Sequence, residues 1–109
     1  IGQKQALGMI LTGRRVSAAE GKDLGFVNEV VPQGQALDAA KRWAALMLEC
    51  SPLAVRASKQ AVYAGMDKPT LREAITTMYP AQQRNLESED YIEGPKAFAE
   101  KRKPDWKNR

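Results

Sequence analysis

The chain has 109 residues, and its 17 basic and 13 acidic side chains give a net charge of +4. It has one cysteine and no histidine, which excludes an internal disulfide bond, histidine-dependent nucleophilic catalysis and a conventional zinc site within these residues. Alanine numbers 16 against 21 for leucine, isoleucine, valine and phenylalanine together, so the core is thin and we expect helices that pack closely on each other and on a partner.

The first residues predict two short helices. Apolar side chains at helical spacing indicate a helix over residues 2–11, and Gly13 is suited to a left-handed stop. Ser17 is the expected N-cap of a second helix over residues 18–24. Glu20, three residues after the cap, is its expected capping-box partner.

An extended stretch and two longer helices follow. Residues 26–31 read as extended, either as one short strand or as a buried segment without a partner strand. The helix predicted over residues 36–49 is apolar around most of its circumference, so it needs to be covered from more than one side. Ser51 is the N-cap of a fourth helix, which we expect to end at Gly65.

The remaining sequence predicts two further helical regions. One runs over residues 71–86 with a kink at Pro80, because proline removes a backbone hydrogen bond. The last begins after the N-cap Ser88 and continues to about Arg102, with a potential break at residues 94–95. The expected fold class is therefore all-α, with at most one short extended segment.

The charge distribution and the single cysteine limit the classes of partner and the cellular compartment. Four basic residues gather at positions 101–103 and 107, where they can attract nucleic acid, an anionic membrane or a phosphorylated small molecule. The two signs are mixed elsewhere, and no apolar run is long enough to span a bilayer, so we expect neither a nucleic-acid nor a membrane partner. The single Cys50 fits a reducing cytoplasm.

Three side chains are candidates for a site. Phe98 and Lys101 are three residues apart, and on a helix they share one face, where a ring and an ammonium group can hold a flat base next to a phosphate. The simpler alternative is a core phenylalanine and a solvated lysine. Tyr79, beside Pro80, is the tyrosine best placed to face a cavity, although packing explains it equally well.

Five sequence blocks occur in a fixed order along the chain. The blocks are Met9–Ala18, Gly25–Pro32, Ser51–Lys59, Ser88–Asp90 and Glu93–Trp106. This succession resembles the C-terminal part of the enoyl-CoA hydratase/isomerase family, the crotonase superfamily, over essentially all 109 residues. The chain also starts at Ile1 rather than methionine, which fits a piece of a longer protein.

The resemblance implies a fold and a role. Residues 1–109 would be the helical C-terminal region of a crotonase-like α/β fold, which builds homo-trimers that pair into hexamers and helps to cover coenzyme A. The N-terminal core of the family, with its oxyanion-holding N–H groups and its catalytic glutamates, would lie outside this chain. The implied parent reaction is reversible hydration of a 2-enoyl-CoA in fatty acid metabolism.

The resemblance also assigns site residues. Phe98 and Lys101 match the aromatic residue and lysine with which the family contacts the nucleotide end of coenzyme A. No catalytic residue is carried over, apart from a loose match of Tyr79 to a tyrosine that some hydratase-lyases use. Neither a metal nor a tightly bound cofactor is implied, because coenzyme A is part of the substrate. The isolated chain is expected to be inactive.

Three other interpretations stay open from the sequence. The parent enzyme is an isomerase or a hydratase-lyase rather than a hydratase. Alternatively, the chain is a non-catalytic assembly module that contacts no ligand. The third and weakest alternative is a small helical nucleic-acid binder, which would show steep salt dependence.

Overall fold

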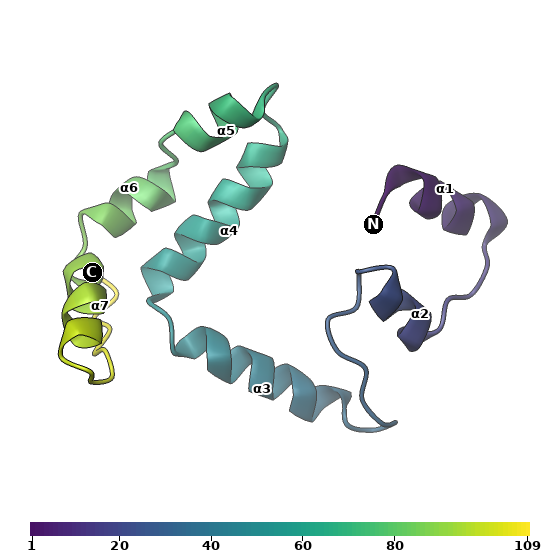
Figure 1. Cartoon of the computed structure of the whole chain (residues 1–109), viewed down its shortest axis with the longest axis horizontal. Coiled ribbons are helices and arrows are strands. Elements are labelled where there is room, and N and C mark those ends of the chain that lie inside the picture. Colours follow the sequence, from purple (N-terminus) through teal and green to yellow (C-terminus); the bar gives the residue numbers. More distant parts are fainter. The chain divides into compact units, whose positions relative to one another are not determined.

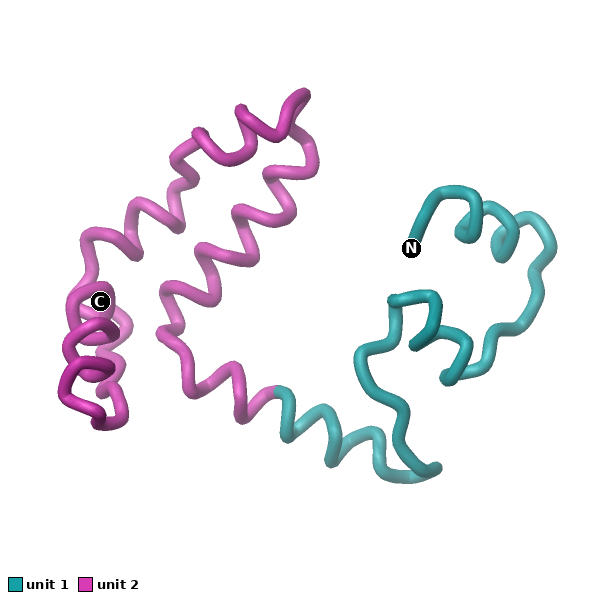
Figure 2. Tube along the Cα trace, in the orientation of Figure 1, with its two compact units in different colours: residues 1–43 teal, residues 44–109 magenta.

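The computed structural model describes all 109 residues, and every regular element in it is a helix (Figure 1). The chain divides into two compact units, residues 1–43 and 44–109, with the boundary inside one helix (Figure 2). The all-α class predicted from the sequence is confirmed. None of the helices combines the length and the apolar character needed to cross a lipid bilayer. The helices are α1 (Gln3–Thr12), α2 (Ala18–Asp23), α3 (Ala36–Leu48), α4 (Pro52–Met66), α5 (Leu71–Thr76), α6 (Pro80–Leu86) and α7 (Glu89–Ala99).

The first two helices begin and end where local signals place them. Gly13 follows α1 with a φ of 60° and donates its N–H to the carbonyl oxygen of Met9, a left-handed stop that suits glycine. Ser17 caps α2 by accepting the N–H of Glu20 at 3.1 Å. The Glu20 carboxylate, however, pairs with Arg14 at 2.7 Å, so this structure contains only half of the predicted capping box.

The stretch after α2 folds back on that helix instead of forming a strand. The N–H groups of Phe26 and Val27 both donate to the carbonyl oxygen of Gly21, at 3.1 and 3.2 Å. A Cβ atom on Gly21 would lie 2.9 Å from each of these two side chains, so glycine is required here. Residues 26–31 are not a strand, because no second strand is present to pair with them, and they are not buried either, since Phe26 is 48% exposed.

Helix α3 is tied to the preceding stretch by one carboxylate. Glu29 accepts hydrogen bonds from Arg42 Nη2 at 2.5 Å and from Trp43 Nε1 at 2.9 Å. Only Ala39 of this helix is buried. The large apolar side chains of α3 are exposed, so the cover predicted from the sequence is not seen within either unit. They are Leu37, Trp43, Leu46, Met47 and Leu48.

The second unit is built around α4, which packs against α5 and α6 (Figure 1). The predicted cap is confirmed, since the hydroxyl of Ser51 accepts the N–H of Ala54 at 3.4 Å. Leu53 and Ala57 are the buried residues of α4. Gln60 of the same helix accepts the N–H of Ala81 at 2.8 Å, which fixes the first turn of α6 on α4.

The single kinked helix predicted over residues 71–86 is wrong. The chain forms two helices with residues 77–79 between them, and Pro80 is the first residue of α6. Proline fits this position because the first N–H of a helix has no partner within the helix. It also keeps the residue before it extended, and Tyr79 has φ −82° and ψ 143°.

Helix α7 contains Pro95 without a break, contrary to the potential interruption at residues 94–95. It ends at Ala99, three residues before the predicted end at Arg102. The C-terminal segment, residues 103–109, then turns back and runs along α7 (Figure 1). Asp90 in the first turn of α7 accepts the backbone N–H of Lys107 at 2.7 Å, so the segment is attached near its end.

Candidate functional site

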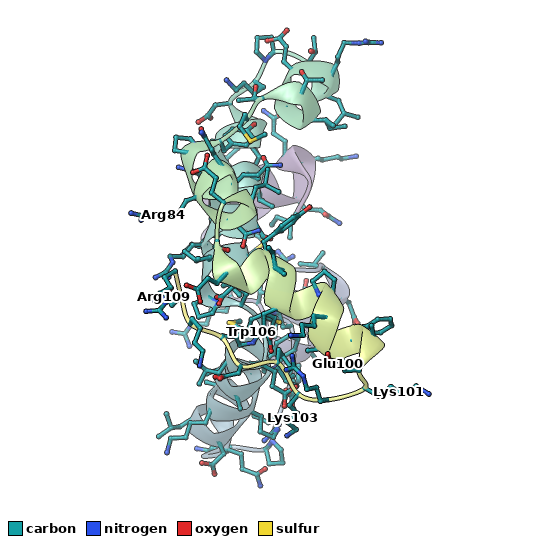
Figure 3. All side chains as sticks on the ribbon, turned by 90° about the vertical axis from the view of Figure 1, so that its left-hand side faces the viewer. Arg84, Glu100, Lys101, Lys103, Trp106 and Arg109 are labelled. Carbon is teal, nitrogen blue, oxygen red and sulfur yellow. The ribbon has the colours of Figure 1, made fainter.

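The end of α7 brings the two predicted ligand-binding residues together at the surface. Phe98 lies in the last turn of the helix and is 87% exposed. Lys101 lies beyond the helix end, and Figure 3 shows its side chain extending away from the ribbon. The premise that both residues share a helix face is therefore wrong. They remain one turn apart, because the N–H of Lys101 donates to the carbonyl oxygen of Phe98 at 3.2 Å.

The turn that holds Lys101 is a Schellman motif. Its second bond runs from the N–H of Arg102 to the carbonyl oxygen of Ala97, at 3.0 Å. Lys101 occupies the left-handed position of the motif with a φ of 53°, a position usually taken by glycine. A residue with a Cβ atom is less stable in this conformation by about 1 kcal/mol. The turn is thus strained at the residue that carries the exposed ammonium group.

An ion-pair network fixes the residue that follows. The guanidinium of Arg102 binds both carboxylate oxygens of Glu93, at 2.5 and 2.9 Å, and its Nε donates to Glu100 at 2.6 Å. Glu93 also accepts the N–H of Asp105 at 2.8 Å. The hydrogen bonds from Arg102 and from Asp105 lower the pKa of Glu93 to about 2. The same pairing with Glu93, and then with Glu100, raises the pKa of Arg102.

This network divides the basic residues near the chain's end into two groups. Arg102 is neutralised by two carboxylates, and Lys107 pairs with Asp105. Lys101 and Lys103 form no ion pair. The end of α7 therefore presents an exposed aromatic ring and, in the turn that follows, lysines without a carboxylate partner. It can hold an anionic group beside a flat apolar one, but it supplies no acid–base pair.

Asp90 and Trp106 hold α7 and the C-terminal segment in place beside this surface. Asp90 is 2% exposed and accepts the hydroxyl of Ser51 at 3.0 Å in addition to the N–H of Lys107. Trp106 donates its Nε1–H to the carbonyl oxygen of Glu49 at 3.0 Å. The start of α4, the start of α7 and the C-terminal segment are thereby linked through buried or half-buried groups.

Tyr79 lies elsewhere, between α5 and α6. It is 5% exposed, and its hydroxyl donates to the carbonyl oxygen of Ala74 at 3.0 Å. It lines a mostly apolar hollow of about 500 Å³ formed by α4, α5 and α6. The structure thus places Tyr79 away from Phe98 in the fold, in a position where packing and one hydrogen bond account for it. No group of three or more metal-ligating side chains is gathered in this chain.

The pairing of Glu93 with Arg102 was not predicted from the sequence. Arg102 was counted among the basic residues at positions 101–103 and 107, and Glu93 only as the start of the last sequence block. They are nine positions apart in the sequence, whereas side chains on one helix meet at spacings of three or four. No local pattern therefore pairs them. The signal that was available is that two acidic residues, Glu93 and Glu100, precede Arg102 within ten positions.

Comparison with known proteins gives consistent matches. A family model described as enoyl-CoA hydratase/isomerase matches residues 1–109. Carnitinyl-CoA dehydratases of Salmonella paratyphi A and Salmonella agona are 41% identical over 107 residues, which are 93% of this chain and 40% of the relative. The chain therefore spans about two fifths of the length of these relatives.

Solved structures agree in fold as well as in sequence. An enoyl-CoA hydratase/isomerase from Mycobacterium paratuberculosis has a TM-score of 0.90 and 36% identity, covering 100% of this chain and 44% of that one. An enoyl-CoA hydratase from Bacillus anthracis has a TM-score of 0.89 and 35% identity, covering 100% of this chain and 42% of that one. The backbone described above is thus similar to part of experimentally determined structures.

Proposed function

The chain belongs to the enoyl-CoA hydratase/isomerase family, and we propose that it is the C-terminal helical part of an enzyme that adds water reversibly to a 2-enoyl-CoA. In this proposal residues 1–109 supply subunit assembly and part of the coenzyme A site. The carnitinyl-CoA dehydratases and enoyl-CoA hydratases among the similar proteins support it, because both names describe water chemistry on CoA thioesters. The reacting carboxylates and the oxyanion-stabilising N–H groups come from a core outside this chain.

The observation that carries the ligand role is the exposed end of α7. An aromatic side chain that is 87% exposed loses about 1.5–3 kcal/mol of hydrophobic stabilisation relative to a buried one. Contact with the adenine ring of coenzyme A restores that stabilisation. Lys101, which has no carboxylate partner, then faces a phosphate of the same ligand. Phe98 and Lys101 are the binding residues of this proposal.

The remaining parts of the proposal follow from the same family. The complete enzyme is a homo-trimer or hexamer in the cytoplasm, and its fatty acyl-CoA substrate is its only nucleotide-bearing partner. Tyr79 is given no catalytic step in this proposal, since packing and the hydrogen bond to the carbonyl oxygen of Ala74 account for its position. An isomerase or hydratase-lyase parent uses the same nucleotide contacts. A module that assembles subunits without touching a ligand is the alternative of a different class.

Steady-state kinetics of the complete enzyme with two substrates test this proposal. Crotonyl-CoA carries the nucleotide, whereas crotonyl-pantetheine has the same thioester without it. We expect Lys101→Ala and Phe98→Ala each to raise the KM for crotonyl-CoA about tenfold, as loss of one charged or aromatic contact predicts. The KM for crotonyl-pantetheine and both kcat values stay unchanged.

The matched control is Lys59→Ala, which removes one exposed positive charge from α4. If Lys101→Ala behaves like this control with both substrates, the nucleotide-site assignment fails and the assembly-module alternative gains support. The 109-residue chain alone is expected to give no turnover of crotonyl-CoA, and measurable turnover refutes the division of roles between this region and the core.

A further inference from the structure

Lys101 adopts a backbone conformation that its own side chain disfavours. A lysine at φ 53° costs about 1 kcal/mol relative to a right-handed residue, and only a surrounding structure that fixes it keeps it there. The Schellman bonds of Lys101 and Arg102 close the turn but use backbone atoms alone. Glycine makes the same bonds without strain. The backbone bonds alone therefore do not explain why a lysine occupies this position, and the explanation has to come from the side chains around the turn.

The side chain of Arg102 anchors that turn to α7. Arg102 donates the N–H that closes the motif, and its guanidinium binds both carboxylate oxygens of Glu93, which lies in α7. Bidentate pairs of this kind fix orientation as well as distance. Glu93 also accepts the N–H of Asp105, so one carboxylate holds both ends of the loop that follows Lys101. The residues that follow Lys101 are thereby attached to α7.

The charges of this clamp do not compete with Lys101 for a ligand. Arg102 is saturated by Glu93 and Glu100, so it offers no free donor pair to a phosphate. Lys101 has no carboxylate within ion-pair distance and extends from the turn (Figure 3). The residue that holds the turn and the residue that offers the charge are thus different.

We propose that Glu93 and Arg102 form a positioning clamp that holds the backbone of Lys101, so that its ammonium group meets the nucleotide end of the CoA thioester. This inference rests on the proposed function, because it requires that Lys101 bind that ligand. A turn that is already fixed does not have to be ordered when the ligand binds, which lowers the cost of binding.

The test measures one quantity, the KM for crotonyl-CoA divided by the KM for crotonyl-pantetheine, in the complete enzyme. We expect Arg102→Gln and Glu93→Gln each to raise this ratio about three- to tenfold, without changing either kcat. Lys59→Gln, an exposed charge removed from another helix, leaves the ratio unchanged. The double variant Arg102→Gln with Lys101→Ala shows the same ratio as Lys101→Ala alone, because a clamp that acts through Lys101 has nothing left to position.

The outcomes distinguish a failure of the proposed nucleotide site from a failure of the clamp alone. If Lys101→Ala leaves the ratio unchanged, the proposed function fails first. If Lys101→Ala raises the ratio but Arg102→Gln and Glu93→Gln do not, or if Arg102→Gln raises it equally with and without Lys101, the clamp is overturned while the nucleotide site stands. Should Arg102→Gln lose helical circular dichroism, Glu93→Gln decides alone, since it keeps the guanidinium and its bond to Glu100.

Discussion

Replacing Asp90 by alanine is expected to release the C-terminal segment from α7. The carboxylate is 2% exposed and accepts three donors from two different parts of the chain. They are the hydroxyl of Ser51 at 3.0 Å and the backbone N–H groups of Lys107 at 2.7 Å and Asn108 at 3.2 Å. Two of these bonds hold the C-terminal segment. The third ties α7 to the cap of α4.

The magnitude follows from the two bonds to the C-terminal segment. A hydrogen bond to a charged acceptor contributes at least about 1.5 kcal/mol net, so losing two costs the attached segment about 3 kcal/mol. Since 1.4 kcal/mol corresponds to a factor of ten, the opening equilibrium rises about a hundredfold. Local opening of this kind is read directly by amide hydrogen exchange.

The assay is hydrogen exchange with mass spectrometry on the complete enzyme, read on the peptide that covers residues 103–109. Asp90→Ala is expected to speed exchange of this peptide about a hundredfold, while Asp90→Asn, which keeps one accepting oxygen, gives an intermediate rate. Asp105→Ala is the matched control, because its carboxylate is on the same segment but is largely exposed. Unchanged exchange in Asp90→Ala refutes the assignment of Asp90 as the attachment point.

Two further predictions each concern one contact. Gly21→Ala places a Cβ atom 2.9 Å from the side chains of Phe26 and Val27, so we expect the free energy of unfolding, measured by thermal unfolding, to fall by about 1–3 kcal/mol. The control is Gly8→Ala, whose Cβ atom meets nothing within 4 Å, and equal effects of the two substitutions contradict the close packing at Gly21. The pKa of Glu93 near 2 lies below its unfolded value of about 4.3, so its contribution to stability is complete above that value and is lost as the pH falls toward 2. An NMR titration that finds the Glu93 carboxylate midpoint near 4 contradicts the ion pair.

Local signals in the sequence predicted the helix starts well. Ser17, Ser51 and Ser88 each accept a backbone N–H three residues later, as their positions before helical patterns indicated. An N-cap needs only its own side chain and the next turn, so its geometry is encoded within four residues. The same holds for Gly13, whose positive φ ends α1.

Features that depend on distant residues were not predictable in this way. The last helix was predicted to reach Arg102, and this prediction was wrong. The guanidinium of Arg102 reaches Glu93 only after the chain reverses at Lys101, a contact that the sequence does not reveal. The sequence gives no sign that the backbone of Lys101 is left-handed, since lysine ordinarily favours a right-handed helix. The break before Pro80 was predicted as a kink because periodicity continues through it. A pattern of apolar residues does not reveal that the backbone between its parts is extended.

The exposed apolar surface supports the proposal that further protein covers these helices. The chain exposes 8975 Å², whereas two separate compact bodies of the sizes of its two units together expose roughly 7,000 Å². The excess is larger than the ~800 Å² that each partner buries in a standard interface. Helices α1 and α5 have no buried residue at all, and Ile10, Leu11, Leu71 and Ile75 are all more than 70% exposed. Such helices gain their stability from the surfaces they pack against. For this reason the complete enzyme is the sample to measure, since the proposal gives these faces and the proposed nucleotide site their partners only there.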